Sequence, residues 1–268
     1  MAGTPRLLIN GRAESSVPAL DRGLAYGDGV FRTLAIVAGR PRWWEAHLAK
    51  LAADCARLQL ACPGADLLAD DLDRLGPLPD QGVLRITVTR GLGPRGYAPI
   101  GLPTRILACW DSPLPEYPAA GLRLRVCNLR LGHQPALAGI KHLNRLENVL
   151  ARGEWDDPTI HEGVLLDVDG RLVSGVMSNL FLWREGRLLT PRLDRCGVAG
   201  VARARLLCLA GQAGLEAAEA DLELADLLAA EEVLACNSLM GLRRVAILEA
   251  RAWPEAVISP RLIPLLDA

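Results

Sequence analysis

The segment GIKHLNRLENVLAR, residues 139–152, places a lysine just before a run of apolar residues at helical spacing. That run, from Leu143 to Arg152, predicts a helix, so Lys141 lies where the chain enters the helix and where a side chain can reach a cleft. The chain has 30 basic residues but only two lysines, Lys50 and Lys141. A lysine amine can form a Schiff base or act as a neutral base, whereas a guanidinium stays charged. Both lysines are therefore candidates for chemistry.

The sequence around this segment predicts a part of the chain built from short strands. The pairs Asp169-Gly170 and Glu185-Gly186 each separate two apolar runs, as tight hairpin turns do. Gly200 precedes a run that predicts a helix over 201–209. The strands expected in this part cover residues 122–129, 164–166, 172–173, 180–183, 188–190, 233–236 and 245–248.

The first part of the chain has the pattern of a sheet with attached helices. Strands are expected over 7–9, 30–37, 83–89 and 106–110, and helices over 44–60 and 67–75. The stretch DSPLPEYPAAG, residues 111–121, holds three prolines without periodicity and predicts a linker. We therefore expect an α/β (α+β) protein with an N-terminal domain over 1–110 and a C-terminal domain over 122–268.

The composition excludes several classes of protein. Half of the 268 residues are hydrophobic and 23% are charged, as in globular proteins. With 30 basic and 31 acidic residues, the chain lacks the basic excess that nucleic-acid binding needs. The start, MAGTPRLLINGRAE, has no signal-peptide pattern, and no apolar run approaches membrane-spanning length. Seven cysteines without C-x-x-C spacing favour free thiols in a reducing cytoplasm.

The glycine-rich string GLGPRG, residues 91–96, matches the dinucleotide-binding pattern, but Pro94 lies inside it and prolines follow it. No helix can begin there, which excludes a pyrophosphate site at a helix N-terminus. The string predicts a loop from which Arg95 and Tyr97 can reach an anionic substrate. The four histidines lack metal-ligand spacing, so we expect no metal site, and His47 is expected to be structural.

Several segments together resemble, in the same order, the fold-type IV pyridoxal-phosphate enzymes, and among them the aminodeoxychorismate lyases. The most specific are GDGVFRT, residues 27–33, and GIKHLNRLE, residues 139–147. LLINGRAE, TRGLGPRGYAP, MSNLFLW, TPRLDRCGVAGVAR and EEVLACNSLMGLRRV resemble them too. The resemblance implies a two-domain fold-type IV architecture with the cofactor between the domains, a small-molecule substrate and a homodimer.

The resemblance assigns cofactor-binding roles to five residues. Lys141 is implied to bind pyridoxal 5′-phosphate covalently and, once released, to act as a general base. Lys50 stands where similar enzymes usually have a phosphate-binding arginine; it keeps the charge but loses the bidentate fork. Val201 and Ala202 open a helix whose free N–H groups suit a phosphate. Ser238 matches a second phosphate-binding turn.

The remaining assignments concern the pyridine ring and the substrate. Ser174 stands where similar enzymes carry a glutamate that pairs with the protonated ring nitrogen, so a weaker electron sink is expected. Elimination of a leaving group needs that sink less than transamination does. Thr33 matches a substrate-side hydroxyl that could relay a proton. Arg32 and Arg95, with Tyr97, are the candidates for binding substrate carboxylates.

The implied reaction converts 4-amino-4-deoxychorismate to 4-aminobenzoate and pyruvate, in folate synthesis. One alternative is a D-amino-acid or branched-chain aminotransferase of the same fold, against which Ser174 argues. Another is a weakly catalytic or non-catalytic cofactor-binding homologue. Ser174 and Lys50 favour that alternative, and the intact Lys141 argues against it.

Overall fold

The computed structural model describes residues 4–267 and divides into two compact units. Unit 1 holds the described residues up to Pro115 together with Lys141–Asn144, and unit 2 holds Glu116–Ile140 and the described residues from Arg145 on. The division after Pro115 falls within the expected linker. The expected C-terminal domain differs from unit 2 in one respect, because the segment with Lys141 groups with the first unit. Residues 1–3 and 268 of the two expected domains lie outside the described residues.

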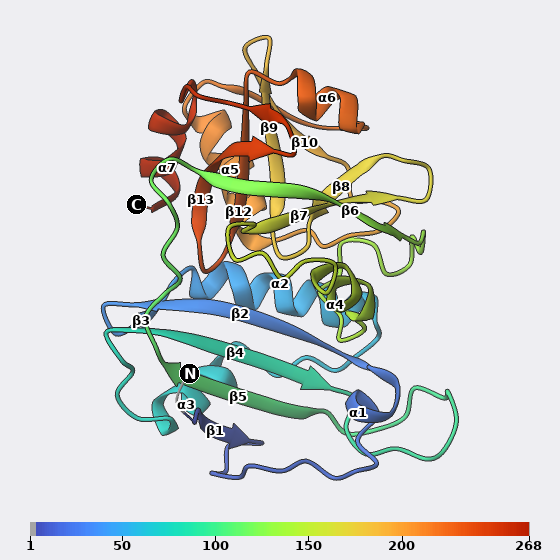
Figure 1. Cartoon of the computed structure of the whole chain (residues 1–268). Helices are drawn as coiled ribbons and strands as arrows, with labels where there is room; N and C mark the ends of the chain where they lie inside the picture. Colours follow the sequence, from blue (N-terminus) through green and yellow to red (C-terminus); the bar gives the residue numbers. More distant parts are fainter. Residues whose placement is uncertain (1–3, 268) are drawn as a thin grey trace. The chain divides into compact units, whose positions relative to one another are not determined.

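Unit 1 is built on an antiparallel sheet (Figure 1). Its strands are paired in the order β1, β5, β4, β2 and β3. Their bounds are Arg6–Ile9 for β1, Gly29–Val37 for β2, Arg40–Pro41 for β3, Gln81–Thr89 for β4 and Thr104–Asp111 for β5. The pairing of β2 with β4 brings Thr33 opposite Arg85.

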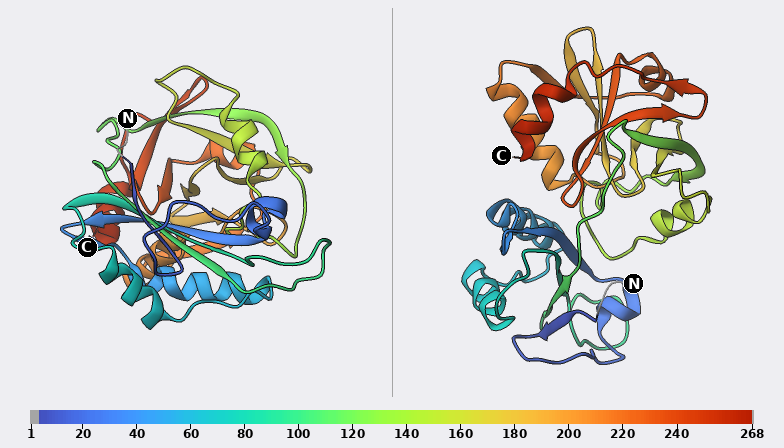
Figure 2. Two further views of the ribbon diagram at one scale, coloured as in Figure 1. Left: turned by 90° about the horizontal axis from the view of Figure 1, so that it is seen from below. Right: turned by 60° about the vertical axis from the view of Figure 1, so that its left-hand side comes forward.

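The helices of unit 1 cover one face of this sheet. Helices α2, Trp44–Arg57, and α3, Ala65–Arg74, lie on the same side of it (Figure 2). Alternation along β2 turns Val30, Arg32 and Leu34 away from Phe31 and Thr33. Leu34 and, on α2, Leu51 are both fully buried. A short helix α1, Arg22–Tyr26, precedes β2.

Unit 2 contains a larger, curled sheet with helices attached. Its strands run in the order β11, β10, β9, β12, β13, β6, β7 and β8, and β14 pairs with β13. The strand bounds are Leu122–Leu131 for β6, Glu162–Asp167 for β7, Leu172–Gly175 for β8, Asn179–Arg184 for β9, Arg187–Pro191 for β10, Glu216–Ala220 for β11, Glu232–Asn237 for β12, Gly241–Leu248 for β13 and Arg251–Ala252 for β14. The helices are α4, Leu146–Arg152; α5, Val201–Gln212; α6, Leu224–Ala229; and α7, Ser259–Asp267.

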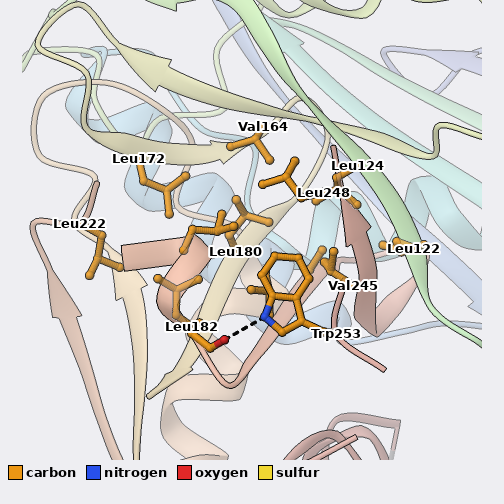
Figure 3. Packing of buried hydrophobic residues seen from close by; sticks show 14 of the residues in the cluster. Leu122, Leu124, Val164, Leu172, Leu180, Leu182, Leu222, Val245, Leu248 and Trp253 are labelled. Carbon is orange, nitrogen blue, oxygen red and sulfur yellow. Dashed lines mark hydrogen bonds between the residues drawn. The ribbon is translucent and has the colours of Figure 1, made fainter. Parts of the chain in front are cut away.

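A large hydrophobic cluster of unit 2 consists mainly of aliphatic side chains packed around Trp253 (Figure 3). Leu180, Leu182 and Val245 are among the side chains that surround Trp253. The indole nitrogen of Trp253 donates a hydrogen bond to the carbonyl of Ala230 at 2.8 Å, so burial leaves its polar atom satisfied. The hydrophobic effect of this cluster holds the sheet in its curled form.

Turn chemistry agrees with the sequence in both hairpins and in the glycine-rich loop. Gly170 has a φ of 83°, and Glu185 and Gly186 have φ values of 52° and 75°, as tight hairpin turns require. Residues 91–103 form a loop without a helix, as Pro94 predicts. Among the described residues, no helix combines the length and apolar character needed to cross a bilayer.

Candidate active site

The main chain of Lys141 is fixed against the start of β2. The N–H of Phe31 donates to the carbonyl of Lys141 at 3.0 Å, and the N–H of Leu143 donates to the carbonyl of Gly29 at 3.0 Å. His142 forms an antiparallel bridge with Val30 between them. The segment therefore lies along β2 like an added strand, and helix α4 begins only at Leu146, later than the expected residue 143.

The Lys141 side chain lies on the face of the sheet that carries Phe31 and Thr33. Its Nζ is 4.6 Å from the centre of the Phe31 ring. The guanidinium of Arg85 is 4.3 Å from the same ring centre, so two cationic groups contact one aromatic ring. Thr33 is half-buried next along this face. Burial lowers the pKa of Arg85, but its guanidinium stays charged.

The N–H of Lys141 is bound by a carboxylate that the sequence analysis did not single out. Asp54, on α2, is 0% exposed, and its Oδ2 accepts the Lys141 N–H at 3.0 Å. The guanidinium of Arg32 pairs with the same oxygen, and the Nζ of Lys50 donates to Oδ1 at 2.5 Å. One buried carboxylate thus joins β2, α2 and the lysine segment.

This arrangement argues against one expected role. Arg32 was expected to bind a substrate carboxylate, but its side chain is 1% exposed and already pairs with Asp54. Alternation along β2 places it on the α2 side of the sheet, away from Phe31. Burial lowers the pKa of Arg32 to about 10. The structure therefore gives Arg32 an internal ion pair, and its contact with a substrate carboxylate stays a prediction.

Lys50 and His47 show how strongly the surrounding cations act. Burial, with the charges of Arg32 and Arg57, lowers the pKa of Lys50 to about 8, while the contact with Asp54 acts in the opposite direction. Burial and the charges of Arg32 and Lys141 lower the pKa of His47 to about 3. His47 is thus a neutral buried side chain at pH 7, in accord with the structural role expected for it.

The loop over 91–103 presents Arg95 and Tyr97 outward. Both are exposed, and Tyr97 is 87% exposed. The loop is tied to α1, because Arg22 donates from Nη1 to the Gly96 carbonyl at 2.8 Å and the ring of Tyr26 lies 5.5 Å from that of Tyr97. Arg95 and Tyr97 therefore project from an anchored loop, and their substrate roles stay predictions.

Unit 2 carries a helix start with the character of an anion site. Helix α5 begins at Val201 after Gly200, which no described side chain caps, and its first turn contains no acidic residue. The Asn179 side chain holds the approach, accepting the Gly200 N–H at 3.1 Å and donating to the Val198 carbonyl at 2.9 Å. A Cβ on Gly200 would lie 2.5 Å from the Asn179 Oδ1. Glycine is therefore required for this close approach.

Ser238 lies in the turn between β12 and β13. The Asn237 side chain shapes that turn, accepting the N–H groups of Leu239 at 2.9 Å and Met240 at 2.8 Å. The same side chain donates to the carbonyl of Met177 at 3.2 Å. Because Cys236 pairs with Asn179 across β12 and β9, the Ser238 turn and the start of α5 are held by neighbouring strands.

Ser174 is buried on β8, and its hydroxyl donates to the carbonyl of Gly175 at 2.8 Å. The carboxylate of Glu162, on neighbouring β7, accepts the N–H groups of Gly163, Val176 and Met177 and the hydroxyl of Ser178. Burial raises the pKa of Glu162. Glu162 thus anchors the turn after Ser174 by accepting four hydrogen bonds.

A group with potential metal ligands lies elsewhere in unit 2. Atoms of His133, Asp167 and Asp169 lie within 4.8 Å of one another. The Asp167 carboxylate already accepts the N–H groups of Asp169 and Arg171 and contacts the His133 ring at 2.8 Å. These hydrogen bonds give the Asp167 carboxylate a role in stabilising the turn. The expectation of no metal site stays a prediction.

The sequence family described as amino-transferase class IV matches residues 29–248. The chain belongs to the class IV aminotransferase family. The matched range includes both the Lys141 segment and the α5 helix start. The fold-type IV architecture and the resemblance stated from the sequence motifs are thereby confirmed.

Characterised members of the class IV family include both lyases and aminotransferases. The aminodeoxychorismate lyase of Vibrio harveyi is 36% identical over 246 residues, 90% of this chain and 91% of that protein. The crystal structure of 4-amino-4-deoxychorismate lyase from Pseudomonas aeruginosa has a TM-score of 0.90 and 47% identity, covering 96% of each chain. A putative branched-chain-amino-acid aminotransferase of Methanocaldococcus jannaschii is 31% identical over 85% of this chain and 82% of its own.

The cofactor of this class IV family is pyridoxal 5′-phosphate, and the described residues fit it. Lys141 provides an amine for the cofactor carbonyl. The uncapped start of α5, with the Gly200 approach that a Cβ would fill, provides N–H donors for a phosphate. Ser174, whose hydroxyl donates to the Gly175 carbonyl, has no carboxylate, and its role beside the ring nitrogen stays a prediction. The chain is therefore an enzyme of the class IV family with this cofactor.

Sequence reasoning did not single out three residues that contact the candidate segments, Asp54 and Arg85 in unit 1 and Asn179 in unit 2. Asp54 lies within a helix whose pattern indicates only an amphipathic face, and no spacing rule connects it to Lys141, 87 positions away. Arg85 is one arginine among many, and only the register of β2 with β4 brings it opposite Thr33. Asn179 directly precedes the apolar run of β9, where a polar residue next to a strand signals little.

Proposed function

We propose that this chain is an aminodeoxychorismate lyase, which converts 4-amino-4-deoxychorismate to 4-aminobenzoate and pyruvate. The observation that carries the proposal is the position of Lys141, the lysine of the GIKHLNRLE segment. Its amine lies on the face of the unit 1 sheet that carries Phe31 and Thr33. The similarity to the lyases of Vibrio harveyi and Pseudomonas aeruginosa over nearly the whole chain supports it.

Lys141 has two roles in the proposed reaction. It would hold the cofactor through its amine and, when that amine is free, would remove the proton from the ring carbon that bears the substrate amine. Bound pyridoxal phosphate supplies an electron sink for that carbon. The carbon–oxygen bond to the enolpyruvyl group breaks, the ring becomes aromatic, and the proton ends on the methyl carbon of pyruvate. Atoms and charges balance without a further reactant.

Two arginines are the proposed contacts of the substrate carboxylates. Arg85 shares the Phe31 ring with Lys141, so its guanidinium lies close to the reacting amine. Arg95 projects from the anchored loop, with Tyr97 beside it. A guanidinium binds a carboxylate through paired N–H donors and suits this task. Arg85 thus takes the place that the sequence analysis gave to Arg32.

The cofactor phosphate is assigned to three groups. The N–H groups of Val201 and Ala202 at the start of α5 supply neutral donors and the positive end of the helix dipole. Ser238 supplies a hydroxyl from the neighbouring turn. Lys50 supplies a positive charge, which suits a phosphate.

Two side chains tune the chemistry in this proposal. Thr33 lies on the same face as the Lys141 amine and offers a hydroxyl to relay a proton. Ser174 brings no negative charge to the ring nitrogen, which leaves that nitrogen largely unprotonated. Such a cofactor suits elimination, because the developing charge leaves with the enolpyruvyl group, and it is less suited to transamination.

The test of this proposal is the variant Lys141→Ala. The wild-type protein should show a visible absorbance that borohydride removes, and it should release pyruvate from 4-amino-4-deoxychorismate. The variant should lose both properties, since no other lysine lies on this segment. Full activity in the variant contradicts the assignment. Retention of the absorbance with transfer of the amine to 2-oxo acids, and no pyruvate, favours an aminotransferase instead.

We further propose a homodimer in a reducing cytoplasm. In the isolated chain, α4 exposes Leu146, Val149 and Leu150 along one stripe, and the 91–103 loop exposes Ile100 and Leu102. Apolar surface of this kind favours burial against a second copy of the chain. All seven cysteines are free thiols, which supports a reducing compartment.

A further inference from the structure

We propose that Asp54 is a positioning residue for Lys141, holding its main chain in place and balancing the positive charge around its amine. This inference rests on the proposed role of Lys141. The carboxylate of Asp54 reaches the lysine segment directly, through the 3.0 Å hydrogen bond from the Lys141 N–H to Oδ2. It is fully buried, so solvent cannot replace this contact.

The hydrogen bond completes the fixation of the Lys141 main chain. The carbonyl of Lys141 already accepts from Phe31, and Leu143 donates to Gly29 on the same strand edge. The N–H of Lys141 points to α2 instead, where Asp54 is its acceptor. Without that acceptor, a buried N–H would lack a partner and the segment would be held on β2 alone. The position of Cα, and hence of the amine, depends on this third contact.

The charge balance gives Asp54 a second effect. Arg32 from β2 and Lys50 from α2 both contact its carboxylate, and the charge of Lys141 acts on His47 of the same helix. Three further arginines add positive charge around the cluster. The charge of Arg42 acts on His47, and that of Arg57 acts on Lys50. The guanidinium of Arg85 contacts the Phe31 ring. Removing the negative charge therefore favours the unprotonated form of the Lys141 nitrogen.

Stability alone does not explain such a group. A buried ion pair contributes little net stability compared with apolar residues of the same volume. Its value lies in fixing geometry, and here the geometry includes the main chain of the reacting lysine. A carboxylate that merely paired with Arg32 would not need to accept the Lys141 N–H.

Asp71 provides a matched control within the same unit. It is also a fully buried acid, on α3, and its Oδ1 accepts from Arg105 Nη2 at 3.2 Å. The same arginine pairs with Oδ2 through Nε. Among the described residues, none of the contacts found for Asp71 involves Lys141. Asp71→Asn thus removes a buried paired charge without touching the lysine segment.

The experiment compares Asp54→Asn, Arg32→Met and Asp71→Asn with the wild type by two readouts. The first is the pH midpoint of the visible absorbance of the holoenzyme. We expect Asp54→Asn to lower it by about one pH unit and Arg32→Met to raise it, because the two variants change the local charge in opposite directions. Asp71→Asn should leave it unchanged. An unchanged midpoint in Asp54→Asn, or an equal shift in Asp71→Asn, overturns the proposal.

The second readout uses the apoprotein and needs no cofactor. Trinitrobenzenesulfonate labels unprotonated amines, and peptide mass spectrometry separates Lys141 from Lys50. At pH 8 the labelling of Lys141 should become several-fold faster in Asp54→Asn and slower in Arg32→Met. If Asp54→Asn does not fold, Arg32→Met decides, and an unchanged rate there overturns the proposal. If the wild-type protein shows no visible absorbance but the variants change the labelling rate of Lys141 as expected, the proposed function is contradicted and the role of Asp54 is not.

Discussion

Lys50 combines a structural contact with the phosphate role proposed for its charge. Its side chain is 23% exposed, and Asp54 engages it at 2.5 Å. Replacing Lys50 by Ala should weaken cofactor binding more than turnover at saturating cofactor, because the charge acts on the phosphate and not on the reacting carbon. A lost charge-assisted hydrogen bond of about 1.5–3 kcal/mol raises the dissociation constant roughly tenfold to a hundredfold. Cofactor titration measures this, and Lys50→Arg is the control that should retain affinity. An unchanged constant in Lys50→Ala contradicts phosphate binding.

Ser174 is proposed to tune the cofactor, because the resemblance implies a glutamate at its position. Replacing it by Glu should raise transamination of simple amino acids relative to pyruvate release, because a carboxylate holds the nitrogen protonated and strengthens the electron sink. The measurement is the ratio of the two activities at matched cofactor content. If both activities fall together at a fixed ratio, Ser174 does not tune the cofactor. If pyruvate release alone rises, the serine is a partly disabling substitution.

At the scale of single residues, the sequence indicated the candidate lysines but not the residues that hold them in place. The scarcity of lysine singled out Lys141 and Lys50, and the structure places their contacts on one carboxylate. Asp54 carries no such signal, because acids are common on helices and its burial depends on packing against β2. The ion pair of Arg32 with Asp54 carries no signal either, since alternation turns Arg32 toward α2, and its contact with a substrate carboxylate stays a prediction.

Helix α2 carries a buried histidine whose titration connects pH to stability. His47 is 2% exposed, and burial with neighbouring cations lowers its pKa from 6.5 to about 3. Below pH 6.5 His47 is therefore protonated in the unfolded chain but stays neutral in the folded chain. The contribution of neutral His47 to the free energy of unfolding is complete above pH 6.5 and is lost as the pH falls toward 3. The expected loss between pH 6 and 5 is about 1 kcal/mol of unfolding free energy.

Urea unfolding of the apoprotein at pH 6 and pH 5 measures this loss. His47→Gln should lose about 1 kcal/mol less than the wild type over that interval, because glutamine does not titrate. His161 offers a control, since it is partly exposed and accepts the Arg123 N–H at 3.0 Å. Equal pH dependence in the wild type and in His47→Gln shows that another group is responsible.

Most elements could be predicted from periodicity and turn chemistry, and the exceptions have physical causes. Strand β11 has the sequence EAAEA, a composition that favours a helix, yet it pairs in parallel with β10 along its whole length. Sheet pairing overrides local propensity there. Helix α7 contains Pro264, which conceals it from sequence rules. Helix α4 begins late because the residues before it pair with β2.

At the scale of the whole molecule, the chain is a class IV enzyme made of two units. The linker was readable from its prolines, and the division falls inside it. The grouping of Lys141–Asn144 with unit 1 could not be predicted from the sequence. Local composition does not indicate that four residues within one unit's part of the chain pack with the other unit. That excursion places the lysine of the family motif on the sheet that carries Phe31, Thr33 and Arg85.

The central claim is that this chain is a lyase and not an aminotransferase. The most direct test is the product balance of the holoenzyme acting on 4-amino-4-deoxychorismate without any 2-oxo acid. The account predicts equal amounts of 4-aminobenzoate and pyruvate over many turnovers, with neither product formed by Lys141→Ala. Turnover that stops unless a 2-oxo acid is added, with the amine transferred to that acid and no pyruvate released, would contradict it.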